Sequence, residues 1–371
     1  MHIANLINPV RHLAVIILTS ANGRMAANEI DLIHGEQSNK MSDLVSVARM
    51  AGVSRATAAR AFAEPEKVRP ATREKVYAAS EVLGFRPNYV ARQLRTQSTR
   101  MIGVMLPTLS NPVFSEQLQG MERVAREQGY ALLVSTTDYD AERESAVLEN
   151  LLRQRVEGVV ITVADAQNSA CLRLLAQEPL PVVLAHNPAA GDFVTVSVDN
   201  QAAMYQATRH LLQLGHRQIA MIAGPVQQSD RAQLRYLGYC QAMQEAALTP
   251  LPLAEMAHHT EAEPHRLQSW LTTVPDVTAL LCSNDLLALS VIGTLQRLGY
   301  RVPQQISVVG FDGIALGERV YPALCSVVQP QRELGEVAME CLTGLLAGVD
   351  ITSRTLNFTL RVGESVARHS F

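Results

Sequence analysis

From residue 101 onward, short apolar segments alternate with longer segments in which apolar residues recur every three or four positions. Short apolar runs bounded by turn residues are typical of strands buried on both faces, and the longer pattern indicates amphipathic helices. The predicted strands are residues 101–106, 130–136, 158–162, 181–185, 219–223, 279–282 and 306–311. The predicted helices include residues 114–128, 142–154, 202–214, 230–247, 285–298 and 333–346.

This alternation predicts an α/β fold in which parallel sheets are covered by helices on both faces. Residues 101–371 are enough for two such lobes rather than one. We place the lobes at about 101–199 and 200–325. The chain is expected to cross back near residues 326–330, so that a last strand, 355–362, returns to one of the lobes.

A different pattern precedes this body. Residues 45–60 read VSVARMAGVSRATAAR, in which two short helical patterns meet at a turn. Gly52 supplies the positive φ that such a turn requires, and Ser54 can cap the second helix. A third helix, residues 70–83, ends at Gly84 and completes an all-α head. The layout is that of a helix-turn-helix, whose second helix enters a DNA major groove; an ordinary helical hairpin is the alternative.

The charge distribution favours the DNA-binding interpretation of this head. Residues 41–100 carry 11 Lys and Arg against 5 Asp and Glu, a net charge of about +6, whereas the whole chain has a net charge of −3. A basic head on an acidic body is typical of a nucleic-acid reader joined to a domain of another kind. A merely solvated basic face remains the alternative.

The flanking segments complete the predicted domain organisation. Residues 1–40 are expected to be a poorly ordered extension or an over-called start, because their apolar run is too short for a signal peptide. We assign residues 41–86 to the helix-turn-helix domain, 87–100 to a short helix with a linker, and 101–371 to the body. The short helical segment has too few residues to be stable alone in water, so its ordering requires a partner.

Composition excludes several other function classes. The five cysteines are scattered without a C-x-x-C pair, which fits reduced thiols in a cytoplasmic protein, and no apolar run is long enough to span a membrane. A metal site is not indicated by His258, His259 and His265, because they lack the spacing of metal ligands. We expect these histidines to lie in an exposed loop. We therefore expect no metal and no cofactor. No catalytic constellation stands out, so the chain is not expected to be an enzyme.

Polar residues gather where the predicted strands end. In a two-lobed α/β body, ligands bind in the loops at the carboxyl ends of strands that face the other lobe. These positions hold Phe114, Asp138, His186, Arg235, Asn284, Asp312 and Gln329. A paired Arg and carboxylate with an aromatic ring opposite suits a sugar or a sugar acid.

Several longer motifs follow one another along the chain. In its first part they are VSVARMAGVSRATAARAF, VRPATREKV and LGFRPNYVARQL, and IGVMLPTLSNPVF lies at the first strand of the body. In the second lobe they are LLQLGHRQIAMIAGP, SNDLLAL, LGYRVPQQISVVGFDG and VVQPQRELGEVAM. Taken in this order, the motifs resemble those of the lactose-repressor (LacI/GalR) family of bacterial transcription regulators. The resemblance covers residues 42–366. It implies a homodimer that binds a near-palindromic operator, with a periplasmic-binding-protein-like body that takes a small effector.

The resemblance also implies which residues contact DNA. In the second helix of the head these are Ser54, Arg55, Ala56, Thr57 and Arg60. Residues 88–95 match the family's hinge helix, in which Asn88 and Arg92 lie beside Leu94, the match to its minor-groove wedge. Packing of Leu94 against the third helix is the alternative. Ala59 departs from the serine more usual in the family, which leaves the operator sequence open.

At the effector site, the resemblance supports Phe114, Arg235, Asn284, Asp312 and Gln329. His186 stands where relatives often carry an acidic residue, which suggests an anionic ligand such as a hexonate. The alternatives are a helix cap for Asn284, an ordinary core position for Phe114 and a surface ion pair for Arg235.

The expected function is an effector-responsive transcriptional regulator, a repressor of sugar or sugar-acid metabolism genes, whose effector is a sugar, sugar phosphate or sugar acid. A periplasmic-type solute-binding protein is the alternative, but it predicts an export signal and no basic head.

Overall fold

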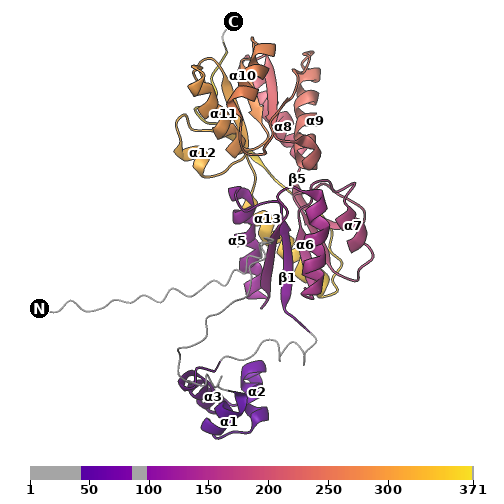
Figure 1. The fold of residues 1–371 in the computed structure, drawn as a ribbon, viewed down its shortest axis with the longest axis vertical. Coiled ribbons are helices and arrows are strands. Elements are labelled where there is room, and N and C mark those ends of the chain that lie inside the picture. Colours follow the sequence, from indigo (N-terminus) through magenta and orange to yellow (C-terminus); the bar gives the residue numbers. More distant parts are fainter. Residues whose placement is uncertain (1–42, 86–97, 370–371) are drawn as a thin grey trace, which may run out of the picture. The chain divides into compact units, whose positions relative to one another are not determined.

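The computed structural model describes residues 43–85 and 98–369, drawn in colour in Figure 1. These residues belong to two compact units, one within residues 19–99 and the other from Arg100 onward. We call the first unit the head and the second the body, and each is described by itself.

The head consists of α1 (Leu44–Met50), α2 (Arg55–Ala63), the short 3-10 helix η1 (Pro65–Lys67) and α3 (Pro70–Val82). The turn between α1 and α2 uses Gly52 at φ +67°, and α3 is followed by Gly84 at φ +61°. Small and branched side chains fill the core between the helices: Val47, Ala48, Ala58, Ala61, Val68, Val76 and Ala79. The predicted helix-turn-helix with a third helix is thus confirmed.

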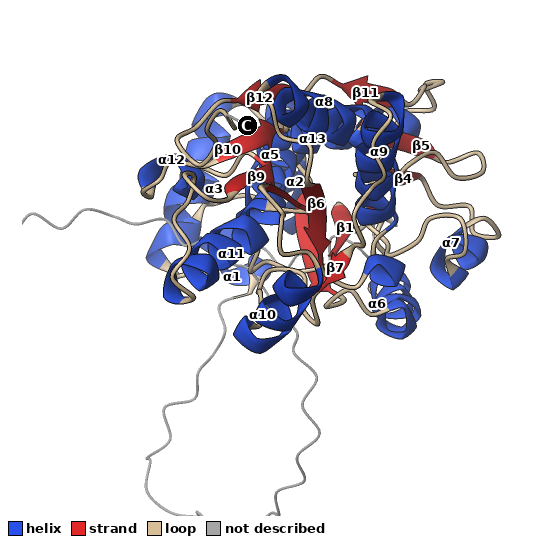
Figure 2. Cartoon of the chain, turned by 90° about the horizontal axis from the view of Figure 1, so that it is seen from above, coloured by secondary structure: helices blue, strands red, loops and turns tan. Residues whose placement is uncertain are grey.

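The body contains two parallel-sheet lobes, which confirms the predicted fold class (Figures 1 and 2). The six-stranded sheet of the first lobe has the order β11 (Arg354–Leu356), β5 (Val194–Val198), β4 (Val182–Ala185), β3 (Gly158–Ile161), β1 (Met101–Leu106), β2 (Ala131–Thr136). The six-stranded sheet of the second has the order β12 (Thr359–Arg361), β10 (Cys325–Val328), β9 (Ser307–Asp312), β8 (Ala279–Cys282), β6 (Ile219–Ala223), β7 (Ala254–Glu255). In the second sheet only β12 runs antiparallel to its neighbour.

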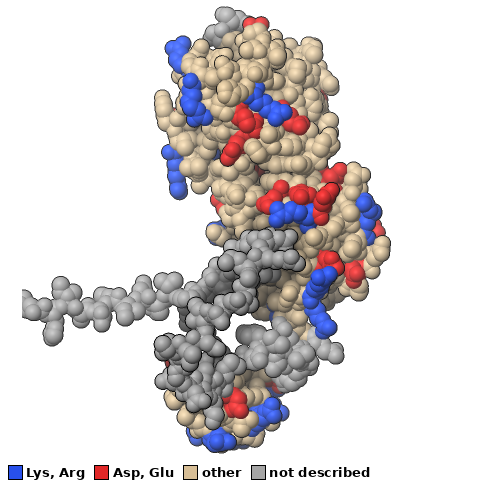
Figure 3. Space-filling model, viewed as in Figure 1, with Lys and Arg blue, Asp and Glu red and all other residues tan. Residues whose placement is uncertain are grey.

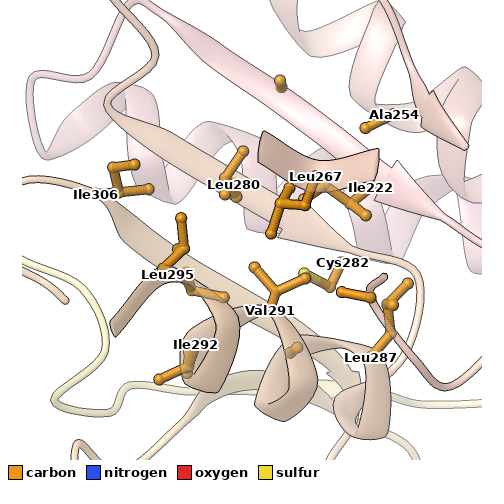
Figure 4. Close-up of a cluster of buried hydrophobic side chains, with 14 of the residues drawn as sticks. Ile222, Ala254, Leu267, Leu280, Cys282, Leu287, Val291, Ile292, Leu295 and Ile306 are labelled. Carbon is orange, nitrogen blue, oxygen red and sulfur yellow. The ribbon is translucent and has the colours of Figure 1, made fainter. Parts of the chain in front are cut away.

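Helices cover both faces of each sheet. In the first lobe, α5 (Pro112–Glu127) and α13 (Gln331–Leu346) pack on one face, and α6 (Ala141–Arg153) and α7 (Ala170–Leu175) on the other. In the second lobe, α8 (Asn200–Gln213) and α9 (Asp230–Glu245) lie opposite α10 (Pro264–Thr273) and α11 (Asp285–Arg297). The short elements η2 (Val226–Gln228) and α12 (Leu316–Arg319) complete this lobe. Figure 4 shows Leu287, Val291 and Leu295 of α11 directed at the strands.

The chain crosses between the lobes between β5 and α8, between β10 and α13, and again between β11 and β12. The single last strand predicted for residues 355–362 is therefore wrong. Two short strands occupy that segment, and each one extends the sheet of a different lobe. The apolar pattern ran through both strands because residues at the crossing are themselves packed: Phe358 contacts the cores of both lobes.

Close helix packing ties α13 to the first lobe. A Cβ atom at Gly335 of α13 would lie 2.0 Å from the carbonyl oxygen of Gln117, and one at Gly120 of α5 would lie 2.1 Å from that of Arg332. Because the obstructing atoms belong to the main chain, they cannot move aside as a side chain can. Glycine is thus required where these two helices cross.

We predict that Gly335→Ala lowers the free energy of unfolding by about 1–3 kcal/mol, the usual cost of overpacking. Gly293→Ala on α11 is the matched control, since its Cβ would meet only the flexible Arg297 side chain at 3.5 Å. That variant is expected to be neutral or to gain up to about 1 kcal/mol from helix propensity. Urea denaturation of both variants checks this, and equal stabilities would contradict it.

Candidate effector cavity and DNA-binding helix

A polar cavity of about 40 Å³ lies between the two lobes of the body. The first lobe lines it with Asn111, Val113, Phe114, Tyr139 and His186. The second lobe contributes Ser229, Arg231, Ala232, Arg235, His259, Ser283, Asn284 and Asp312, and Gln329 lies at a crossing between the lobes. Six of the seven residues predicted from the strand ends are among them. The cavity therefore brings together side chains that are distant in the sequence.

The first-lobe wall is aromatic. Phe114, in the first turn of α5, is buried and meets the His186 ring edge-on, with 5.6 Å between the ring centroids. Burial, together with the positive charges of Arg231 and Arg235, lowers the pKa of His186 to about 3. His186 is therefore neutral at physiological pH and brings no charge to this wall. Phe114 belongs to the hydrophobic core of the first lobe and also lines the cavity. The predicted cavity position and the alternative, an ordinary core position, are therefore both correct.

Arg235 is fixed from three sides in the second lobe. Its Nε donates to Oδ1 of Asn200 at 2.8 Å, an Nη donates to the carbonyl of Ser283, and its guanidinium stacks over the Phe311 ring at 3.7 Å from the centroid. Its other Nη lies 3.9 Å from Oδ1 of Asp312. The ion pair anticipated for Arg235 exists, but it is buried beside the cavity rather than exposed on the surface.

Asp312 links the cavity to a chain crossing. It accepts a hydrogen bond from Nε2 of Gln329 at 2.9 Å. Burial raises the pKa of Asp312 to about 6, against the opposing effects of the Arg235 charge and of hydrogen bonds from Gln329 and Asn111. The Asp312 carboxyl group is thus mostly ionised at pH 7 but takes up a proton in mild acid.

Two residues of the second lobe close the cavity. Asn284 caps α11 by accepting from the main-chain N–H of Leu287 at 2.9 Å, and its Nδ2 donates to the carbonyl of His259 at 2.6 Å. Capping and cavity lining therefore coexist at Asn284. The His259 ring stacks on Tyr139 of the other lobe, with centroids 3.9 Å apart. The prediction that His259 lies in an exposed loop is wrong, because stacking on Tyr139 partly buries its ring. Burial lowers the pKa of His259 to about 4.

Asp138 is the one predicted cavity residue that does not line the cavity. Its carboxylate forms an ion pair with Arg143 at the surface of the first lobe. Asp138 and Tyr139 both have positive φ, 55° and 60°, and this sharp turn directs the second residue, not the first, into the cavity. The prediction from strand ends thus selected the neighbour of the residue that lines the wall.

Beside the cavity, the start of α9 is hydrogen-bonded to the first lobe. The N–H of Asp230 donates to the carbonyl of Ala164 at 2.8 Å, and Oδ2 of Asp230 accepts from the N–H of Ala166 at 3.0 Å. Asn187 donates to the same carboxylate oxygen at 2.8 Å. Arg231 donates from Nη1 to the carbonyl of Val163 at 2.8 Å. We call this group, Asp230 and Arg231 with Asn187 and residues 163–166, the clasp. The sequence prediction missed both Asp230 and Arg231.

The clasp rests on a buried acid of the first lobe. Glu144 of α6 is only 2% exposed and accepts from the N–H of Ala164 at 2.6 Å. Burial raises its pKa to about 7, although the Ala164 hydrogen bond and the Arg231 charge oppose the rise.

In the head, four of the predicted DNA-contacting residues, Ser54 to Thr57, lie at the start of α2, and Arg60 lies in its last turn. Ser54 accepts from the N–H of Thr57 at 3.1 Å and so caps the helix. Arg55, Ala56 and Arg60 are exposed, and neither arginine forms an ion pair with another described residue. Figure 3 shows Lys and Arg side chains on the part of the head that is drawn in colour. Asn88, Arg92 and Leu94 lie outside the described residues.

Two family models match the chain. The model for bacterial regulatory proteins of the lacI family matches residues 43–88, and the model for periplasmic binding proteins and the sugar-binding domain of the LacI family matches residues 99–353. The chain belongs to the LacI family. It is therefore a DNA-binding transcriptional regulator with an effector-binding body, not an enzyme. A lacI-type head does not fit the alternative, a solute-binding protein.

Relatives in the LacI family match most of the chain. The HTH-type transcriptional repressor PurR of Aliivibrio salmonicida is 31% identical over 81% of this chain and 91% of its own length. Catabolite control protein A of Priestia megaterium is 31% identical over 86% and 97%, respectively. The lac repressor dimer bound to operator and an anti-inducer has a TM-score of 0.79 at 26% identity, covering 88% of this chain and all of that one.

The described residues contain no cluster of His, Cys, Asp and Glu suited to hold a metal ion. None of their helices is long and apolar enough to cross a membrane.

We predict that Glu144→Gln changes the pH dependence of stability. In the wild type, the unfolded carboxyl ionises near pH 4.5, but the folded one stays protonated to about pH 7. Stability from this group is therefore lost as pH rises between these values. The variant has no such loss, so its free energy of unfolding relative to wild type should rise by about 1–3 kcal/mol from pH 5 to pH 7 and then level off.

Urea denaturation across this pH range measures the effect. Glu149→Gln is the control, because Glu149 lies on the same helix with its side chain 61% exposed. A relative stability of Glu144→Gln that does not change with pH would contradict the prediction.

Proposed function

We propose that this LacI-family protein acts as a homodimeric repressor of a near-palindromic operator. A ligand bound between its lobes determines whether the protein binds or releases the operator. The observation that carries the proposal is the combination of a capped, cation-bearing helix in the head with a buried polar cavity in the body. The first suits base reading in a major groove, and the polar side chains that line the second can form hydrogen bonds with the hydroxyl groups of a small ligand.

The DNA-reading residues we propose are Ser54, Arg55, Ala56, Thr57 and Arg60 of α2 and its cap. Arg55 lies in the first turn, the part of a recognition helix that reaches base edges, and an arginine pairs with guanine through two parallel hydrogen bonds. Thr57 is tied to Ser54 through both its main chain and its hydroxyl group. This arrangement holds the exposed Arg55 on a rigid first turn, which favours specific over loose contacts.

For residues 88–95 we propose the hinge-helix role that the family resemblance implies. In this proposal Leu94 enters the minor groove as a wedge, and Asn88 and Arg92 contact the backbone beside it. A leucine inserted between base pairs costs unstacking energy but bends the duplex so that more of the protein touches it. Folding of this segment on DNA would couple the head to the body.

For the cavity we propose a sugar or sugar-acid effector held by Arg235, Asn284, Asp312 and Gln329, with the rings of Phe114 and Tyr139 on the opposite side. A ligand that binds between two lobes stabilises the arrangement in which it contacts both. The effector therefore controls DNA affinity by selecting one relative position of the lobes, and hence of the two protomers.

We predict that Arg55→Ala weakens binding to an operator, selected from random duplexes by the full chain, by about 1–3 kcal/mol while random DNA is bound nearly as before. Lys75→Ala on α3 removes the same charge from an exposed position outside α2 and is the control. Fluorescence anisotropy with both duplexes separates the outcomes. Equal losses on operator and random DNA for both variants would argue against base reading by Arg55.

We predict that Arg235→Lys weakens effector binding at least tenfold. Lysine cannot reproduce the planar guanidinium that donates hydrogen bonds to both Asn200 and Ser283. The probe is whichever compound most raises the melting temperature of the full chain among sugars, sugar phosphates and hexonates. Isothermal titration gives the dissociation constants, and circular dichroism establishes that the variant is folded. An unchanged dissociation constant would remove Arg235 from the effector site.

A further inference from the structure

Arg231 has a partner for only part of its guanidinium group. The side chain is 5% exposed and lines the cavity from the first turn of α9. Its Nη1 donates to the carbonyl of Val163 in the first lobe and lies 3.1 Å from Oδ1 of Asp230. Its Nη2 is buried and has no hydrogen-bond partner among the described residues. Leaving a buried guanidinium N–H without an acceptor is costly, so this atom calls for a specific explanation.

The neighbouring carboxylate of Asp230 does not supply the missing acceptor. Oδ2 of Asp230 already accepts from Ala166 and from Asn187, and Oδ1 faces Nη1 of Arg231. Asp312 lies beside Arg235 and accepts from Gln329. Asp230 and Asp312 therefore each accept hydrogen bonds from other donors. Nη2 of Arg231 is left to donate to an acceptor on a bound molecule.

Two further cavity atoms share this condition. Nε2 of His186 and Oε1 of Gln329 are buried without a partner among the described residues. The three atoms differ in chemistry: a cationic donor, a nitrogen of a neutral imidazole and an amide acceptor. A ligand that satisfies all three needs an anionic acceptor at one place and hydroxyl groups at others.

We propose that Arg231 binds the acid group of the effector, and that the effector is a small polyhydroxylated monocarboxylate. This inference rests on the proposed function of the cavity as the effector site. A carboxylate oxygen gives Nη2 a charge-assisted hydrogen bond, and a hydroxyl donates to Oε1 of Gln329. A monoanion suits the cavity better than a phosphate dianion, because Asp230 and Asp312 are already buried there and a second negative charge would face both.

The same residue connects recognition to the arrangement of the lobes. Nη1 of Arg231 holds the first-lobe carbonyl of Val163, and Nη2 faces the ligand. A bound carboxylate therefore orients the guanidinium that belongs to the clasp. A neutral sugar in the same cavity lacks this link. The acid group, rather than the hydroxyl groups, is what distinguishes the effector from related sugars.

The first test is a thermal-shift and titration series with the full chain. The probes are D-gluconate, D-galactonate and D-mannonate, each compared with its parent hexose, hexose 6-phosphate and hexitol. We expect at least one hexonate to bind at least tenfold more tightly than its hexose and hexitol. Tighter binding of a hexose or a hexose 6-phosphate, or binding of none of the hexonates, would overturn the acid-group assignment.

The second test pairs a change in the protein with a change in the ligand. A hexitol has a CH₂OH group in place of the carboxylate and is otherwise the same chain. Arg231→Gln removes the contact to the acid group of the hexonate, whereas for the hexitol it removes only the support that the clasp gives. The hexonate affinity should therefore fall by about tenfold to a hundredfold more than the hexitol affinity, as expected for a lost charge-assisted hydrogen bond. Equal weakening of both ligands would mean that Arg231 only supports the clasp, and would overturn the proposal.

Two controls separate this inference from its foundation. Arg209→Gln removes a charge from an exposed position on α8 and should leave hexonate binding unchanged. Operator binding by the full chain is measured in parallel, with and without the hexonate. Specific operator binding that responds only to neutral sugars would refute the role of Arg231 but retain the proposed function. Loss of any operator preference would refute the proposed function itself.

Discussion

The body depends on hydrogen bonds that join charged groups of one lobe to the main chain of the other. Ala164 stands at the centre: its N–H is held by Glu144 from its own lobe, and its carbonyl is held by the start of α9 from the opposite lobe. Buried main-chain and charged groups lose much if left unpaired. These hydrogen bonds therefore help to fix the relative position of the lobes near the cavity, together with apolar contacts of Ile314, Leu286 and Leu289 with the core of the first lobe.

Burial gives the cavity an unusual balance of charge. It raises the pKa of Asp312 and Glu144 and lowers the pKa of His186 and His259, so acids and imidazoles both move toward their neutral forms. At pH 7, Arg235 keeps its charge and Asp312 is mostly ionised, whereas His186 and His259 are neutral. The cavity therefore combines a few ionic groups with neutral polar groups and aromatic rings.

Local patterns in the sequence were sufficient for much of the fold. The apolar runs predicted β1, β6 and β8 with their observed bounds, because fully buried strands need continuous apolar residues. The alternating pattern of β5 was missed. In the site, strand ends identified six of the fourteen residues that line the cavity, but the prediction missed Tyr139 and Arg231. Which of two successive turn residues faces a ligand depends on backbone angles, and contacts between lobes have no local signature.

The two short strands after α13 bear on how the molecule is made. Because β11 extends one sheet and β12 extends the other, neither lobe is built from a continuous stretch of chain. During synthesis, neither sheet is complete until residues 354–361 have left the ribosome, although β1 to β5 of the first lobe have emerged long before. A nascent chain arrested earlier exposes an unpaired edge on each sheet, which is the surface that chaperones protect from aggregation.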